Sequence, residues 1–272
     1  MENLFHKIEE QHPEPQQVGY GAGKKAKLVI FDLDGTLTAS KMEMDAEMAL
    51  LIEKLLEKRM VAVIGGGKYE QFQKQLLTKL EVPKELFKNF FLFPTSGASF
   101  YRHNDQDWEQ VYMENLSEEE KKRIFEAFEK TFQGLNYSHP EKVYGEIVED
   151  RETQVTFSAL GQEAPVWLKE EWNKEYNAER LKMAEMLQET LPDLEVRIGG
   201  LTSIDVTRKG IDKEYGIRQI KKHLGVDFDE MLFVGDALFH GGNDSAVLRT
   251  GVPCFEVKGP EETKKLIRDL LD

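Results

Sequence analysis

The chain has 272 residues, of which 40% are hydrophobic, 10% aromatic and 32% charged, and its formal net charge is −14. At roughly 150 residues per domain, this length predicts one large domain or two medium ones with a buried core. The acidic balance argues against a nucleic-acid partner, because binding a phosphate backbone needs a basic surface. An anionic substrate therefore has to be held by local positive charge or by a metal ion.

The sequence also indicates a compartment. Cys254 is the only cysteine, which excludes an intrachain disulfide and favours a reducing environment. No run approaches 18 apolar residues, and residues 1–17 lack the apolar stretch of a signal peptide. We therefore expect a cytoplasmic protein without a membrane partner, either a monomer or a homodimer. Residues 1–25, which are polar and rich in Pro, Gln and Gly, are predicted to form an N-terminal tail.

The first elements after this tail predict a parallel sheet. An apolar, β-branched run at residues 27–31 indicates a strand buried on both faces, and a second such run occupies residues 60–64. Between them, residues 45–58 place apolar side chains at helical spacing. Because strand, helix and strand form the unit of parallel α/β sheets, we expect a Rossmann-like core.

The middle of the chain has a different pattern. Residues 98–101 and 146–160 alternate apolar and polar residues, as antiparallel strands with one solvated face do. Ser117 opens a predicted capping box and a helix. Residues 164–191 predict a long, charged helix, and residues 196–206 return to the composition of a strand.

The α/β pattern resumes toward the C-terminus. A helix, two buried strands and a closing helix are predicted at residues 213–223, 231–234, 252–257 and 261–271. The predicted fold class is therefore α/β, with a parallel-sheet core at residues 26–94 and 206–272. An α+β domain at residues 95–205 is predicted to be inserted into this core.

The most informative segment is D-L-D-G-T-L-T, residues 32–38, directly after the first predicted strand. It places the carboxylates of Asp32 and Asp34 at the carboxyl end of a parallel strand, where open α/β sheets bind ligands. Their mutual repulsion requires a cation, a proton or hydrogen bonds, and Mg²⁺ prefers such oxygen ligands. A lone D-x-D is usually an ordinary turn, whereas the full string after a buried strand is far more specific.

This string resembles the first motif of the haloacid dehalogenase superfamily. The resemblance implies that Asp32 is a nucleophile that becomes phosphorylated and that Asp34 is the general acid and base. The third motif of the superfamily is matched by Lys213, in the string G-I-D-K. By resemblance, Lys213 offsets the negative charge of the nucleophile and of the bound phosphate.

The fourth motif is matched by G-D-A-L-F-H-G-G-N-D, which begins directly after the predicted strand at residues 231–234. The resemblance implies that Asp236 binds Mg²⁺ together with Asp32 and with Asp34, the latter through its main-chain carbonyl. It also implies that Asn243 and Asp244 orient the Asp236 carboxylate or a metal-bound water.

The second motif departs from the superfamily pattern, which has Ser or Thr after the second strand. Here the chain has Gly65, Gly66, Gly67 and Lys68. The backbone N–H groups of Gly66 and Gly67, at the start of a helix, can bind an anion instead, and Lys68 can assist.

The inserted domain resembles the type IIB cap of the superfamily, in its α-phosphomannomutase branch. Arg151 matches an arginine of that cap, and Ser203 and Asp205 match a Ser-x-Asp that contacts sugar hydroxyls. Two further arginines of the branch are replaced here by Lys41, a predicted substrate-binding residue, and by Gln162. Because lysine cannot reproduce the bidentate grip of arginine on phosphate, this departure favours hydrolysis over isomerisation.

We therefore prefer the hypothesis of a Mg²⁺-dependent phosphatase of a small phosphorylated metabolite, a sugar phosphate, that acts through an aspartyl-phosphate. The alternative is a phosphomannomutase-like hexose phosphate isomerase that uses the same phospho-aspartate. A third hypothesis is a non-catalytic regulatory protein that kept the fold. The presence of Asp32, Asp34, Lys213 and Asp236 argues against the third.

Overall fold

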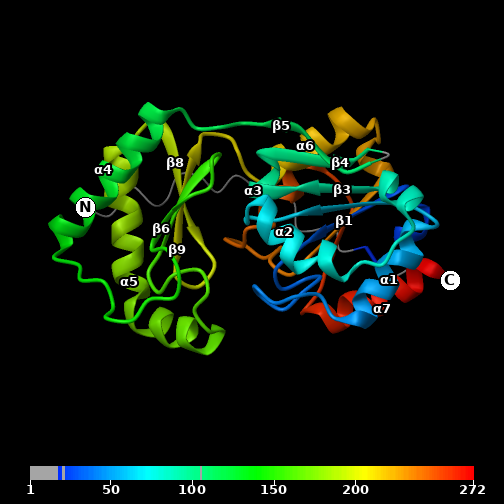
Figure 1. Cartoon of the computed structure of the whole chain (residues 1–272), viewed down its shortest axis with the longest axis horizontal. Helices are drawn as coiled ribbons and strands as arrows, with labels where there is room; N and C mark the ends of the chain where they lie inside the picture. The colour runs from blue at the N-terminus through cyan, green and yellow to red at the C-terminus, as the bar shows by residue number, and fades with distance from the viewer. Residues whose placement is uncertain (1–17, 20–21, 105) are drawn as a thin grey trace.

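The computed structural model describes residues 18–19, 22–104 and 106–272, which form two β-sheets with their own helices (Figure 1). Most of the predicted N-terminal tail lies outside the described residues. Its last four residues form the 3-10 helix η1 (Ala22–Lys25). No helix in the described ranges is both long enough and apolar enough to cross a bilayer.

The larger sheet has seven strands in the order β11-β10-β1-β2-β3-β4-β5. Its strands are β1 (Leu28–Asp32), β2 (Met60–Ile64), β3 (Phe90–Phe93), β4 (Ser99–His103), β5 (Trp108–Met113), β10 (Met231–Gly235) and β11 (Cys254–Glu256). Its helices are α1 (Ala46–Leu56), α2 (Tyr69–Gln75), α3 (Pro94–Gly97), α6 (Lys213–Leu224) and α7 (Pro260–Leu271). The five strands from β11 to β3 are parallel to one another, which confirms the predicted α/β core.

Both faces of β1 are buried, as its apolar run predicts. Val29 and Phe31 belong to the apolar cluster that includes α1 and α7. Leu28 and Ile30 point to the opposite face and belong to the cluster that includes α6. Because alternate side chains of a strand point to opposite faces, helices on both sides of the sheet hold β1 at its centre.

The smaller sheet is antiparallel, in the order β6-β7-β9-β8, with two long helices on one face (Figure 1). Its elements are β6 (Val148–Asp150), β7 (Gln154–Ser158), β8 (Leu194–Gly199), β9 (Ser203–Arg208), α4 (Glu118–Leu135) and α5 (Val166–Thr190). Apolar residues of β7 and β9, such as Phe157 and Ile204, pack with residues of α4 and α5 in one buried cluster. The predicted capping box at Ser117 is confirmed at the start of α4.

The structure differs from the sequence-based expectation where the chain leaves the larger sheet. The sequence predicts that the inserted unit begins at residue 95, yet β4 and β5 extend the larger sheet beside β3. Thr95, Ser96 and Gly97, all with positive φ, reverse the chain directly after β3. Alternating hydrophobicity identifies an antiparallel strand but does not identify the sheet that it joins. The chain therefore reaches the smaller sheet only after Met113.

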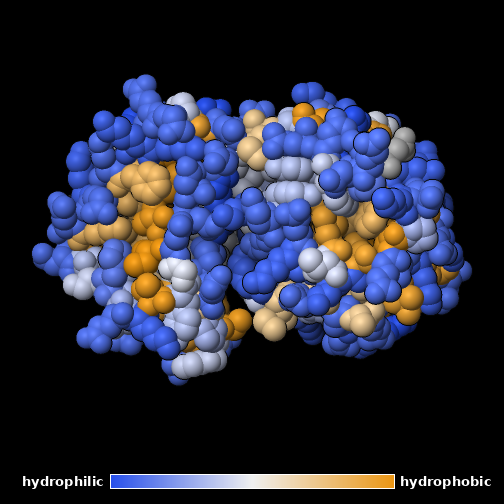
Figure 2. Space-filling view, viewed as in Figure 1, coloured by the Kyte–Doolittle hydropathy of each residue, from blue (hydrophilic) through white to orange (hydrophobic). Residues whose placement is uncertain are grey.

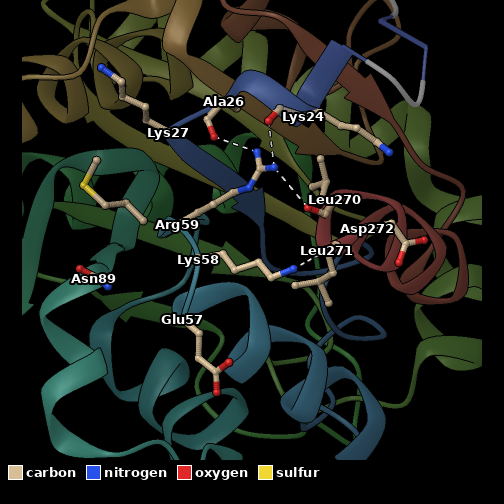
Figure 3. Close-up of a pocket in the computed structure, with 11 residues that line it drawn as sticks. Lys24, Ala26, Lys27, Glu57, Lys58, Arg59, Asn89, Leu270, Leu271 and Asp272 are labelled. Carbon is tan, nitrogen blue, oxygen red and sulfur yellow. Dashed lines mark hydrogen bonds between the residues drawn. The ribbon is translucent and has the colours of Figure 1, made fainter.

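Arg59 connects the amino end of the larger sheet to the start and the end of the described chain. Its guanidinium donates hydrogen bonds to the carbonyl oxygens of Gly23, Lys24, Ala26 and Leu270, at 2.7–3.2 Å. Figure 3 shows the bonds to Lys24, Ala26 and Leu270. Arg59 lies in a hollow of about 720 Å³. Because all these acceptors are backbone groups, Arg59 serves to hold η1 and α7 in place.

We predict that Arg59→Met lowers the free energy of unfolding by roughly 1–3 kcal/mol, since four carbonyl groups lose a charged donor. Urea unfolding followed by circular dichroism measures the change. Arg102→Met is the control, because Arg102 is exposed and, among the described residues, its guanidinium forms only a 3.6 Å ion pair with Glu109. Equal stability of the two variants would contradict the role assigned to Arg59.

Candidate active site

Three carboxylates meet at the carboxyl end of the central strands. β1 and β10 are parallel neighbours, so Asp32, the last residue of β1, and Asp236, the first residue after β10, lie at the same edge of the sheet. Ligand atoms of Asp32, Asp236 and Asp244 lie within 4.8 Å of one another. We call these three residues the carboxylate cluster. Asp32 and Asp244 are almost completely buried.

Lys213 supplies positive charge to this cluster from the first turn of α6. Its Nζ donates to Asp32 Oδ1 at 2.6 Å and also to Asp244 Oδ1. Burial alone would lower the pKa of Lys213, but the charges of Asp244 and Asp32 outweigh it and hold the pKa above its usual range. The sequence predicts that Lys213 lies beside Asp32, and the structure places it there.

The carboxylate cluster has more negative charge than Lys213 can balance. Burial raises the pKa of Asp32 to about 8, although the attraction of Lys213 opposes the change. Burial and the neighbouring Asp244 likewise raise the pKa of Asp236. Both raised pKa values mean that the fully ionised form of the carboxylate cluster is energetically unfavourable without a further cation.

The donor atoms of the cluster fit a divalent metal ion. Three ionised carboxylates against one ammonium leave two negative charges, and Asp32 Oδ2 is buried without a hydrogen-bond partner among the described residues. Hard cations such as Mg²⁺ prefer oxygen ligands of this kind. Gly35 leaves the room that this arrangement needs, because its φ is +92° and a Cβ there would collide with the Asp236 carboxylate.

The side chain of Asp34 lies outside the carboxylate cluster. Its carboxylate accepts hydrogen bonds from the Lys41 backbone N–H at 2.6 Å and from Gln71 and Gln75 of α2, and it pairs with Lys41 Nζ at 3.0 Å. Burial alone would raise the pKa of Asp34, but the charge and hydrogen bonds of Lys41 and a hydrogen bond from Gln75 hold it below its usual range. The two aspartates of the D-x-D string therefore have separate environments.

The glycine turn after β2 is held by the turn after β3. Thr95 donates its backbone N–H to Gly67 O at 2.9 Å, and Ser96 donates to Gly65 O at 2.8 Å. A Cβ on Gly66 would meet no atom within 4 Å, so this residue borders open space. Within the described chain, the Gly66 and Gly67 N–H groups donate to no acceptor. Both amides are therefore free to bind an anion.

One face of the smaller sheet is polar and lies against the larger sheet's loops. Paired residues of β7 and β9 form it: Gln154, Thr156, Ser158, Ser203, Asp205 and Thr207. Thr156 donates to Asp205 Oδ1 at 2.7 Å, and Gln154 donates to Asp205 and, at 3.4 Å, to Gly66 O. Hydrophilic side chains border the junction of the two parts on the face shown in Figure 2. A polar face that is nevertheless buried is suited to a ligand with many hydroxyl groups.

Ionic contacts also cross this junction. Arg151, from the loop after β6, donates to Gly66 O at 3.0 Å and to Glu149 at 2.8 Å. Lys68 forms an ion pair with Glu149 at 2.9 Å. The structure thus brings together Gly66, Lys68 and Arg151, which the sequence assigns to one binding site.

Some site residues differ from the sequence-based expectations. Asn243 is exposed and makes no hydrogen bond with another described residue. Gln71 and Gln75 contact Asp34 but carry no motif that would identify them. Lys169, on α5, is 9% exposed and donates to Gln162 O at 2.7 Å. The burial of Lys169 could not be predicted from the sequence, because a lysine in a highly charged helix normally lies on a solvated face.

Comparisons with known proteins agree with this geometry. The sequence profile of the eukaryotic phosphomannomutase family matches residues 48–272. The phosphomannomutase of Saccharomyces cerevisiae is 28% identical over 255 residues, which cover 92% of this chain and 96% of the yeast protein. The phosphomannomutase of Spinacia oleracea is 28% identical over 250 residues, with 90% and 95% coverage.

A solved structure supports the fold independently. An N-terminally truncated, IMP-bound IMP-nucleotidase of Plasmodium falciparum superposes with a TM-score of 0.65 at 17% identity, covering 90% of this chain and 68% of that chain. The predicted resemblance to type IIB members of the haloacid dehalogenase superfamily is confirmed. The chain belongs to the eukaryotic phosphomannomutase family.

Proposed function

We propose that this chain transfers a phosphoryl group on a sugar phosphate through an aspartyl-phosphate at Asp32, and that it acts as a hexose phosphate mutase. The carboxylate cluster carries the proposal, since it holds a buried carboxylate against Lys213 with one oxygen, Oδ2, unpartnered. The family supports the mutase, which the sequence treats as the alternative, better than the preferred phosphatase.

Asp32 acts as the nucleophile in this proposal. Its carboxylate oxygen bonds to phosphorus while the bond from phosphorus to the sugar oxygen breaks. Lys213 holds the other oxygen of Asp32 and remains protonated, so it offsets negative charge as the phosphoryl group approaches. The Gly66 and Gly67 N–H groups bind phosphoryl oxygens, in place of the missing hydroxyl of the second motif.

Asp34 moves the proton. As a carboxylate it first removes the proton of the sugar hydroxyl that attacks the phospho-aspartate, and it then returns that proton to the departing sugar oxygen when the bisphosphate phosphorylates Asp32 again. To do so its carboxylate must leave the hydrogen bonds from Lys41, Gln71 and Gln75 that hold it in this structure. Those contacts keep Asp34 apart from the repulsive carboxylate cluster.

We propose Mg²⁺ as the cofactor of the carboxylate cluster. Asp32, Asp236 and Asp244 would hold the ion, with the main-chain carbonyl of Asp34 as a further ligand. When bound, the ion supplies positive charge that allows an anionic carboxylate to approach an anionic phosphate.

The cap residues are proposed to recognise the sugar. Ser203 and Asp205 lie on the polar face of the smaller sheet, where Thr156 and Gln154 already orient the Asp205 carboxylate. Arg151, Lys68 and Lys41 contribute positive charge around the same junction. We propose that closure of this junction excludes water during transfer, as isomerisation requires.

Hydrolysis is the second candidate, because Lys41 and Gln162 stand where the branch has arginines. A weaker grip on the sugar monophosphate would release it from the phosphorylated enzyme before its hydroxyl attacks, and water would then attack the phospho-aspartate. The same nucleophile therefore serves both reactions, and retention of the sugar phosphate beside the phospho-aspartate decides between them.

We predict that Asp32→Asn lowers kcat by at least about 10³-fold, because the amide cannot form the phosphoenzyme. Turnover of p-nitrophenyl phosphate and of mannose 1-phosphate measures the loss. Asp229→Asn serves as the control and keeps full activity, because Asp229 is exposed and precedes the amino end of β10, whereas the carboxylate cluster lies at the carboxyl end. An Asp32→Asn variant that retains wild-type turnover would exclude the mechanism.

A coupled assay separates the two candidate reactions. With mannose 1-phosphate and a hexose bisphosphate activator, we expect mannose 6-phosphate to form faster than free phosphate, because the closed junction limits access of water. Enzymatic detection of both products in one sample gives the ratio. Release of free phosphate without isomerisation would support hydrolysis and remove the mutase.

Metal binding is testable without turnover. Mg²⁺ should raise the Tm of EDTA-treated wild-type protein, since an ion that binds only the folded state stabilises it by mass action. The rise should be largely lost in Asp236→Ala and retained in Asp229→Ala. Differential scanning fluorimetry across a Mg²⁺ titration gives both values. An equal rise in all three proteins would show that the ion binds elsewhere.

A further inference from the structure

Lys169 differs from every other buried lysine in the described part of the chain. Lys213 contacts two carboxylates, and Lys121 and Lys264 each contact three within 4.0 Å. Lys169 is also buried, at 9% exposure, but no carboxylate of the described residues lies within this distance of its Nζ. Within the described chain, its ammonium donates a hydrogen bond only to Gln162 O, at 2.7 Å. A buried charge is normally paired or used to bind a ligand.

The surroundings of Lys169 place it at the junction of the two parts. The charges of Lys41 and Asp34, which belong to the loop after β1, act on its ammonium, and so does the charge of Arg151. Burial first, then repulsion from Lys41 and Arg151, lowers the pKa of Lys169 to about 8, although Asp34 opposes the change. The amine therefore still carries its charge at neutral pH, in an environment that disfavours it.

The acidic partners of the neighbouring Lys41 and Arg151 are already engaged in ion pairs and do not contact Lys169. Lys41 is paired with Asp34 at 3.0 Å, and Arg151 with Glu149 at 2.8 Å. An anion that enters between these side chains would relieve the repulsion and give Lys169 the partner that the protein does not provide. The side-chain Nε2 of Gln162, next to the same carbonyl, is also buried without an acceptor among the described residues.

We propose that Lys169 binds the second phosphate of a sugar bisphosphate, the one that is not undergoing transfer. This inference rests on the proposed phosphoryl transfer at Asp32 and assigns the cap-side phosphate to an amine of α5. Lys169 thereby selects bisphosphates over monophosphates and retains the bisphosphate while it reorients. Lys41 and Gln162, which stand where the branch has arginines, are both neighbours of Lys169. Lys169 thus compensates for the missing arginines.

The test compares affinities for glucose 1,6-bisphosphate and glucose 6-phosphate. Calorimetric titration of Mg²⁺-loaded protein in an Asp32→Asn background, which blocks turnover, gives both dissociation constants. We expect Lys169→Met to reduce the preference for the bisphosphate by about tenfold or more, the value of one charged hydrogen bond. Lys169→Arg should keep the preference within about threefold. Lys182→Met, at an exposed position of the same helix, should leave it unchanged.

The melting temperature of the variant distinguishes a ligand-binding role of Lys169 from a structural one. Because Met has the shape of the lysine stem without its unpaired charge, Lys169→Met should melt at the wild-type temperature or above it. An unchanged bisphosphate preference in this variant would overturn the proposal. So would equal losses for both ligands, a lowered Tm, or a wild-type protein that binds both ligands equally. Each of these results leaves the role of Asp32 standing, since that role is tested by turnover.

Discussion

The structure depends on an excess of negative charge that is held in place at the end of a buried strand. Asp32 cannot move away from Asp236 and Asp244, because β1 is fixed on both faces by apolar side chains and paired on both edges. Lys213 balances one charge and leaves two. The fold thereby builds a position whose ionised form a cation would stabilise, and it places there a carboxylate oxygen without a hydrogen-bond partner among the described residues. That combination is suited to an attack on phosphate.

A second constraint is the burial of a polar sheet face. The apolar side chains of β7 and β9 pack with α4 and α5, so alternation turns Thr156, Asp205 and their neighbours toward the glycine turn after β2. Contacts across the junction, such as that from Arg151 to Gly66, bring these groups close to the carboxylate cluster. In the proposed function, the reacting phosphate and the sugar are recognised by different sheets, and a substrate has to contact both.

Sequence patterns predict the parallel core because its strands are continuous apolar runs that end in motif residues. The resemblance to the superfamily motifs identifies Asp32, Lys213 and Asp236, and each of them ends, begins or follows an element that the patterns predict. The membership of β4 and β5 in the larger sheet could not be predicted, because pairing partners are not encoded in alternation. Lys169 and the hydrogen bonds of Gln71 and Gln75 to Asp34 depend on how distant elements pack. Local pattern does not carry that information.

The central claim is that Asp32 carries the phosphoryl group during transfer, and peptide mass spectrometry tests it most directly. Protein incubated with Mg²⁺ and a hexose bisphosphate is quenched in acid, digested and compared with a sample treated with hydroxylamine, which cleaves acyl phosphates. The account predicts one phosphoryl group on the peptide that contains Asp32, at that residue, and its loss after hydroxylamine. A phosphoryl group on another residue, or turnover without any phosphoenzyme, would contradict it.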